Sequence, residues 1–144
     1  MTCPICEKNQ QVNPKEIYRN KNIVVSHAPL NANLLGYFYV EPTAHYENWA
    51  EIPLEVLSDV QAAIKKADSF LRNEKLAERV YSVTISEAVR HIHFHLIPRK
   101  EDANLKGTPL IEKATQQLAH DDDPVVTERA AEEFFQKAKE FFTN

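Results

Sequence analysis

The stretch HIHFHLI, residues 91–97, decides how this chain is interpreted. Side chains of a β-strand alternate between its two faces, so the three histidines are expected on one face, about 6.6 Å apart along the backbone. The opposite face carries Ile92, Phe94 and Leu96, and burying each contributes on the order of 1.5–3 kcal/mol. The pattern therefore predicts a strand over residues 91–97, anchored by its apolar face, that presents a row of imidazoles.

A row of imidazoles suits two kinds of chemistry. The histidines could be ligands of one metal ion whose bound water attacks a substrate. Alternatively, one neutral imidazole could attack phosphorus, while its neighbours donate protons to phosphoryl oxygens and to the leaving group. A purely structural role is less expected, because aligned histidines repel one another once protonated. The residues by themselves leave the choice between the two chemistries open.

The rest of the chain predicts an α+β fold with a largely antiparallel sheet. Short strands are expected at residues 17–18, 23–26, 36–41 and 79–85. A long amphipathic helix begins near Pro53, with apolar residues at spacings of three and four from Leu54 to Leu71. A short helix is expected over 108–118. A C-terminal helix is expected, capped by Asp123 with Pro124 at its first position. It would carry Val126, Ala130, Phe134, Ala138 and Phe141 on one face, widened by Ala131, Phe135 and Phe142.

Length and composition exclude several classes of protein. The chain has 144 residues, 43% hydrophobic and 26% charged, as expected for one globular domain over 1–144. The net charge is −4 with no basic stripe, which argues against a nucleic-acid partner. No apolar run is long enough for a membrane span and no signal peptide is visible, so a cytoplasmic location is expected. The only glycines are Gly36 and Gly107, which excludes glycine-rich phosphate loops.

The two cysteines, Cys3 and Cys6, form a C-x-x-C motif. Without a secretory signal a structural disulfide is a poor expectation. A metal site, a redox pair and two inert thiols remain as interpretations.

Three segments together resemble the histidine triad superfamily. They are HIHFHLI followed by Pro98 and Arg99, the N-terminal CPIC, and YFYVEPTAH, which ends at His45. The resemblance covers residues 1 to about 100. It implies an α+β domain with one long central helix and a C-terminal helix, usually a homodimer whose sheets join across the two-fold axis.

The resemblance also implies an activity, the transfer or hydrolysis of a nucleoside monophosphate from phosphoramidates or dinucleoside polyphosphates. His93 would be the nucleophile and form a covalent nucleotidyl-histidine, and His95 would hydrogen-bond phosphoryl or leaving-group oxygens. In zinc-bearing members the same resemblance implies a structural zinc ion held by Cys3, Cys6, His45 and His91.

The segment before the triad departs from the family pattern. Glu87 stands where the family has a glutamine and Ala88 where it has a serine, and the usual glycines are missing. An acid beside a phosphate would repel it unless Arg90 or Arg99 compensates. Residues His27 and Asn31 are the nearest matches to the family's ribose-binding position.

Two other functions stay open at this point. One is a catalytically weak nucleotide-binding module on the same fold, which the Glu87 departure motivates. The other is a metal-water hydrolase in which all three histidines hold one ion.

Overall fold

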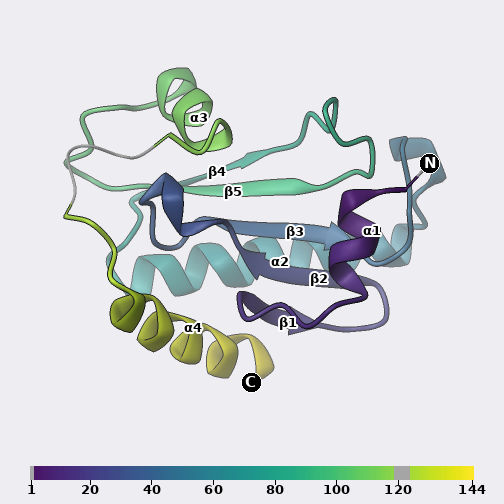
Figure 1. Cartoon of the computed structure of the whole chain (residues 1–144), viewed down its shortest axis with the longest axis horizontal. Coiled ribbons are helices and arrows are strands. Elements are labelled where there is room, and N and C mark those ends of the chain that lie inside the picture. The colour runs from purple at the N-terminus through teal and green to yellow at the C-terminus, as the bar shows by residue number, and fades with distance from the viewer. Residues whose placement is uncertain (1, 119–123) are drawn as a thin grey trace.

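The computed structural model describes residues 2–118 and 124–144, in which a single β-sheet has helices on both faces (Figure 1). The expected α+β class is confirmed. In chain order the elements are α1 (Pro4–Asn9), β1 (Glu16–Arg19), β2 (Ile23–His27), the 3₁₀ turn η1 (Leu30–Ala32), β3 (Phe38–Pro42), the 3₁₀ turn η2 (Trp49–Glu51), α2 (Leu54–Asn73), β4 (Arg79–Val83), β5 (Phe94–Arg99), α3 (Thr108–Thr115) and α4 (Glu128–Thr143).

The sheet has five strands in the order β1-β2-β3-β5-β4, and each neighbouring pair is antiparallel. In the register between β3 and β5, Tyr39 lies opposite His95. Because side chains alternate along a strand, Tyr39 and Glu41 share a face of the sheet with His95, while Phe38 and Val40 point to the other face. The register therefore places the second half of the histidine strand beside an aromatic and acidic strand.

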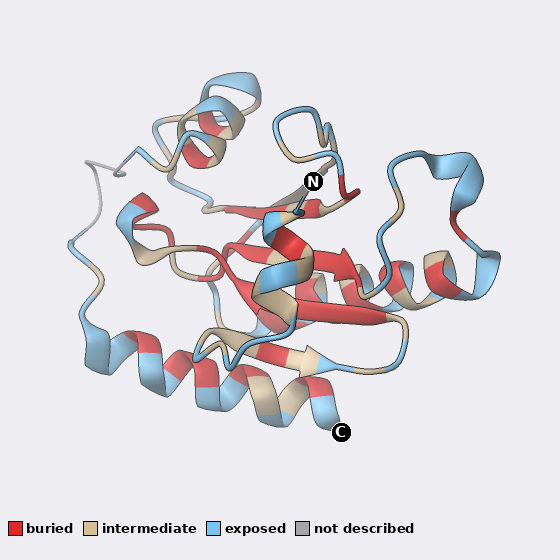
Figure 2. Ribbon diagram, turned by 45° about the vertical axis from the view of Figure 1, so that its right-hand side comes forward, coloured by how far each residue is buried: buried red, intermediate tan, exposed pale blue. Residues whose placement is uncertain are grey.

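One face of the sheet carries the main hydrophobic core. Figure 1 shows α2 behind the sheet and α4 along its lower edge, and Figure 2 shows the buried side of α4 turned toward the strands. Phe38, Val40, Phe94 and Leu96 pack in one cluster with residues of both helices. The predicted apolar face of the histidine strand is thus confirmed, since Ile92, Phe94 and Leu96 are all buried.

The opposite face of the sheet is covered in part by α1 and α3. A second buried cluster there joins Tyr37 and Ile97 to Leu110 and Ala114 of α3. In Figure 1, α1 crosses in front of the strands, on the side away from α2. The space between α1 and α3 is where a cavity forms.

Gly36 fixes where β3 begins. Its φ of +95° is a conformation that side chains with a Cβ rarely adopt, and an added Cβ would lie 2.5 Å from Leu71 Cδ2 on α2. The chain can therefore turn into β3 directly against the helix.

Three expectations about the helices and strands are corrected. β5 begins at Phe94, so His91 and His93 lie in the segment that leads into the strand. Leu54, expected on the apolar face of α2, is 83% exposed. The rest of the predicted stripe is in the core, since Val60, Ala67 and Leu71 are buried, and Leu57 and Ile64 pack against the core. The third correction concerns the C-terminal helix.

The helix α4 begins at Glu128, and Thr127 is its N-cap, with the hydroxyl accepting a hydrogen bond from the Ala130 N–H at 3.1 Å. Pro124 lies outside it, and the proposed cap Asp123 lies outside the described residues. Ala130 is exposed, while Ala131, Phe134, Phe135, Ala138 and Phe142 are buried. Among the described residues no helix is long and apolar enough to cross a membrane.

Candidate functional site

A cavity of about 590 Å³ lies on the sheet face that carries His95 and Tyr39. Its walls come from α1, from β3 and β5, from the segment 83–93 and from the end of α3. A volume of this size is typical of small-molecule sites in proteins. His93 and His95 line it, whereas His91 does not.

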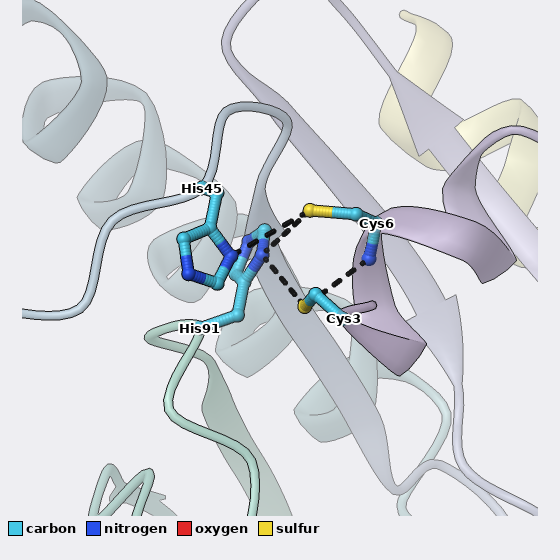
Figure 3. A group of neighbouring side chains, drawn as sticks. All are labelled: Cys3, Cys6, His45 and His91. Atoms are coloured by element: carbon cyan, nitrogen blue, oxygen red, sulfur yellow. Dashed lines mark hydrogen bonds between the residues drawn. The ribbon is translucent and has the colours of Figure 1, made fainter. Parts of the chain in front are cut away.

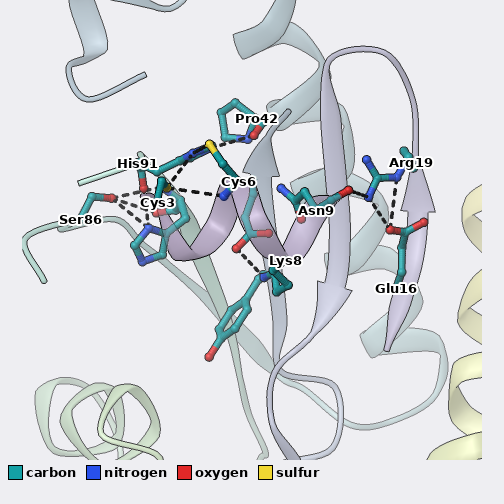
Figure 4. Close-up of polar contacts among 12 residues, drawn as sticks. Cys3, Cys6, Lys8, Asn9, Glu16, Arg19, Pro42, Ser86 and His91 are labelled. Atoms are coloured by element: carbon teal, nitrogen blue, oxygen red, sulfur yellow. Dashed lines mark hydrogen bonds and ion pairs between the residues drawn. The ribbon is translucent and has the colours of Figure 1, made fainter. Parts of the chain in front are cut away.

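His93 is held from both its backbone and its ring. The ring Nδ1 lies 2.8 Å from the His91 carbonyl oxygen. A carbonyl can only accept, so Nδ1 carries the proton and donates, and Nε2 keeps its lone pair. The backbone is held by Ser86, whose hydroxyl accepts from the His93 N–H at 3.1 Å (Figure 4). Thr84 holds it as well, because its hydroxyl donates to the His93 carbonyl at 2.8 Å. His93 therefore keeps a lone pair on Nε2, on a backbone held by two hydroxyl groups.

His95 lies deeper in the cavity wall. Burial, with a smaller contribution from the charge of His93, lowers the pKa of His95 to about 4. Its Nδ1 lies 2.6 Å from the Tyr37 hydroxyl, and its ring meets the Tyr39 ring edge-on at 5.2 Å. At neutral pH His95 is thus an uncharged imidazole with one nitrogen engaged behind it.

His91 turns away from the cavity toward the two cysteines (Figure 3). Its Nδ1 lies 3.6 Å from Cys3 Sγ and 3.4 Å from Cys6 Sγ. His45 Nδ1 lies 3.6 Å from Cys6 Sγ. The ligand atoms of these four residues all lie within 4.8 Å of one another. The helix α1 and the segment that contains His91, far apart in sequence, meet at this cluster.

The outer nitrogens of both histidines support a metal site. His91 Nε2 donates to the Pro42 carbonyl at 2.8 Å, and His45 Nε2 lies 2.9 Å from the Glu47 carboxylate. Both contacts place the proton on Nε2, so both Nδ1 lone pairs point toward the sulfur atoms. Metal-bound histidines usually make such a second hydrogen bond to a carbonyl or carboxylate. Two thiolates and two imidazoles without an open position fit a structural zinc ion.

The pKa values of the two thiols shift in opposite directions. Burial acts to raise the pKa of the Cys3 thiol, but hydrogen bonds from the Cys6 backbone and from the Cys6 and His45 side chains together lower it below its ordinary value. Burial raises the pKa of Cys6.

The alternative in which all three triad histidines hold one catalytic ion does not fit this geometry. His91 belongs to the sulfur cluster and does not line the cavity that His93 and His95 line.

His27 is corrected to a core residue. It is 3% exposed and its ring lies against Phe38, Phe134 and Phe135. Its Nδ1 donates to the Ala28 carbonyl at 2.7 Å, and its Nε2 accepts from the Gly36 N–H at 2.9 Å. Both ring nitrogens are satisfied inside the protein, so His27 does not offer a group to a substrate.

Arg99 is also corrected. It lies at the far end of β5, where its guanidinium binds Glu78 at 3.0 Å, and it does not line the cavity. Asn31 is exposed on η1 and reaches the cavity only through Gln117, whose side-chain oxygen lies 3.5 Å from its amide nitrogen.

Glu87 and Ala88 do line the cavity. The Glu87 carboxylate is 80% exposed and lies 3.6 Å from Arg90, so the compensating cation is Arg90 and not Arg99.

Sequence reasoning missed several residues of the cavity region. Tyr37, which binds His95 from behind, and Glu41 could have been found, because Tyr37, Tyr39 and Glu41 alternate along one strand. Lys8 lines the cavity from α1 and binds the buried Glu41 carboxylate at 2.8 Å, with its ammonium over the Tyr39 ring (Figure 4). Neither Lys8 nor Ser86 had a sequence signal, because only the folded chain brings them to the triad.

Comparisons with known proteins agree with this geometry. An uncharacterized HIT-like protein of Methanocaldococcus jannaschii is 29% identical over 106 residues, which is 69% of this chain and 80% of that protein. A zinc-bound histidine triad family protein from Mycobacterium smegmatis has a similar structure, with a TM-score of 0.67 at 17% identity over 99% of this chain and 94% of that one.

Two further structures share the fold. One is a hypothetical histidine triad nucleotide-binding protein from Sulfolobus tokodaii, with a TM-score of 0.67 at 18% identity over 99% of this chain and 93% of that one. The other is the Plasmodium falciparum diadenosine triphosphate hydrolase, with a TM-score of 0.62 at 14% identity over 92% and 79%. The HIT domain itself matches residues 9–102, more than half of the sequence. The chain therefore belongs to the HIT domain family.

Proposed function

We propose that this protein is a nucleotide hydrolase or nucleotidyl transferase that releases a nucleoside monophosphate from phosphoramidates or dinucleoside polyphosphates. The observation that carries the proposal is the hydrogen bond from His93 Nδ1 to the His91 carbonyl, which leaves Nε2 of a cavity-lining imidazole free to attack. An imidazole fixed in this tautomer is a suitable nucleophile toward phosphorus.

The proposed reaction has two steps. His93 Nε2 attacks the α-phosphorus, a nitrogen–phosphorus bond forms, and the bond to the leaving group breaks with its electron pair passing to that group, which takes up a proton. Water or another acceptor then attacks the phosphorus, the nitrogen–phosphorus bond breaks, and the nucleoside monophosphate leaves as His93 is restored. His95 hydrogen-bonds phosphoryl oxygens in both steps, where negative charge develops.

The cavity offers a cationic contact in an otherwise acidic protein. The side chain of Lys8 is 34% exposed, and its Nζ spends one hydrogen bond on Glu41, which leaves donors for a phosphate oxygen. The buried Glu41 carboxylate keeps the ammonium at the wall. We therefore assign Lys8, with Glu87 and Ala88, to the substrate-binding wall.

The test is nucleoside monophosphate release from a panel of adenosine and guanosine phosphoramidates and dinucleoside polyphosphates, by wild type and His93→Ala. Wild type is expected to release product and form a protein adduct with the mass of one nucleotidyl group, and the variant to do neither. Equal release by both proteins would disprove the covalent mechanism.

A catalytically weak binding module is the second candidate, favoured by the Glu87 carboxylate at the cavity wall. Calorimetric titration with a nucleoside monophosphate separates the two: binding without turnover of any substrate in the panel would support the module.

The proposal includes a homodimer acting in the cytoplasm and a single domain over residues 1–144. Sedimentation equilibrium of the zinc-loaded chain tests the dimer, which a monomer at micromolar concentration would contradict.

A further inference from the structure

A buried tyrosine lies directly behind the second cavity histidine. The Tyr37 hydroxyl and His95 Nδ1 are 2.6 Å apart, and Tyr37 has no exposed surface. A contact this short between a hydroxyl and a ring nitrogen is a strong hydrogen bond. The proposed reaction uses only the Nε2 side of His95, so the role of Tyr37 is not yet accounted for.

The direction of this hydrogen bond follows from the groups around it. Among the described residues, His95 Nδ1 is the one hydrogen-bond partner of the Tyr37 hydroxyl. Buried polar groups in proteins are almost always hydrogen-bonded, so the Tyr37 proton needs an acceptor. If His95 Nδ1 carried a proton and donated it to the Tyr37 oxygen, the Tyr37 proton would be left without one. The Tyr37 hydroxyl is therefore the donor and His95 Nδ1 the acceptor.

The buried pair of Tyr37 and His95 stays uncharged. Burial, together with the neighbouring Tyr39, raises the pKa of Tyr37 well above its ordinary value, so the hydroxyl keeps its proton. Burial likewise keeps His95 unprotonated at neutral pH. A neutral hydroxyl facing a neutral imidazole leaves two arrangements, one with the proton of His95 on Nε2 and one with it on Nδ1.

We propose that Tyr37 is a positioning residue that donates to His95 Nδ1 and thereby holds His95 as the Nε2–H tautomer, with a proton donor facing the phosphoryl oxygens of a bound nucleotide. The inference rests on the proposed function. In the opposite tautomer Nε2 would present a lone pair to phosphoryl oxygen, and the contact would be repulsive. No bond is made or broken at Tyr37.

The two histidines of the cavity then have opposite tautomers. His93 carries its proton on Nδ1, held by the His91 carbonyl, and offers a lone pair. His95 accepts at Nδ1, held by the Tyr37 hydroxyl, and offers a proton. The His91 carbonyl thus prepares His93 to act as the nucleophile. The Tyr37 hydroxyl prepares His95 to donate a hydrogen bond to the phosphoryl oxygens.

The direct test is nitrogen-15 NMR of zinc-loaded wild type labelled at histidine, without substrate, at neutral pH. His95 is expected to carry its proton on Nε2, with the Nδ1 resonance of a hydrogen-bond acceptor. A protonated Nδ1 would overturn the inference. This measurement reads the tautomer whether or not any nucleotide is turned over, so its failure is distinct from failure of the proposed function.

The kinetic test is Tyr37→Phe, which keeps the buried ring and removes the hydroxyl. Removing an oxyanion donor outright lowers kcat by roughly 100- to 1,000-fold, so loosening one is expected to lower it by about 10- to 100-fold. KM should change less than about twofold. Tyr81→Phe is the matched control, because the Tyr81 hydroxyl binds the Gly107 N–H outside the cavity. An unchanged kcat in Tyr37→Phe, or an equal loss in Tyr81→Phe, would contradict the positioning role.

Discussion

Ser86 is the residue on which the geometry of the triad segment depends. It has φ of +53°, in the left-handed region, and its hydroxyl holds the His93 backbone. A non-glycine residue there is strained, and such strain tends to persist where surrounding contacts require it. The family's glycines are missing from this segment, and Ser86 takes the conformation that a glycine would take most easily.

Replacing Ser86 separates the effect of its left-handed backbone conformation from the effect of its hydroxyl. Ser86→Gly relieves the strain but loses the hydroxyl, whereas Ser86→Ala loses the hydroxyl and keeps the strain. Ser86→Ala is expected to unfold more easily than Ser86→Gly by about 1 kcal/mol, because the left-handed conformation disfavours a Cβ. Urea unfolding measures the difference, and equal stabilities would argue against strain at this position. Both variants should lower kcat, since both release the His93 backbone.

Glu87 is the residue that departs most from the family pattern at the cavity. Its exposed carboxylate is expected to repel an anionic substrate, with Arg90 compensating in part. Glu87→Gln should lower KM by roughly two- to fivefold, the range of exposed charge interactions, and the effect should shrink in high salt. Glu78→Gln, which removes an acid paired with Arg99 outside the cavity, is the control. An effect that is independent of salt would exclude a charge mechanism.

At the scale of elements, α1 connects the metal cluster to the cavity. Cys3 and Cys6 bracket its first turn, while Pro4, Ile5 and Lys8 line the cavity from the same helix. A helix of six residues has little stability alone, so its place on the sheet depends on what holds its ends. The metal cluster therefore supports a wall of the cavity.

Removing the metal should affect both stability and nucleotide binding. A strong chelator is expected to lower Tm by roughly 5–10 °C, because structural zinc binding is coupled to folding. Affinity for a nucleoside monophosphate should fall as well, since α1 loses its anchor. Titration of the chelated protein below its Tm measures this, with zinc add-back as the control. An unchanged affinity would mean that α1 stays in place without the metal.

At the scale of the whole molecule, His27 couples stability to pH. Burial lowers its pKa to about 4, whereas an unfolded histidine titrates near 6.5. Between these values the unfolded state binds more protons than the folded state, so stability falls as pH falls. The contribution is fully present above pH 6.5 and is lost progressively toward pH 4, and amounts to on the order of 3 kcal/mol.

Comparing wild type with His27→Gln isolates the contribution of His27 to the pH dependence of stability. The glutamine oxygen can still accept from the Gly36 N–H, but it does not titrate. Unfolding free energies measured from pH 7.5 to 4.5 should fall more steeply for wild type, and the contributions of His95 and of the metal cluster cancel in the difference. Parallel curves would contradict a buried neutral His27.

Much of the molecule follows from local patterns. Alternation predicted the apolar face of the triad strand, and the three- and four-residue spacing predicted α2, because both depend only on neighbouring residues. The C-x-x-C motif indicated a metal site, and the family resemblance indicated that His45 and His91 complete it. The predicted stripe of α2 packs in the core except at Leu54, which is exposed, since the face that a helix buries is set by the sheet it meets.

What the sequence determined by itself is the class of fold, the histidine row and the set of possible metal ligands, because these depend on residue type and spacing. Only the tertiary structure decided that His27 lies in the core and that Arg99 lies away from the cavity. It also decided that Lys8 and Ser86 line the cavity and that Tyr37 lies behind His95. The physical reason is that these roles depend on contacts between segments far apart in the chain. The tautomers of His93 and His95 in particular are set by groups that no local pattern connects to them.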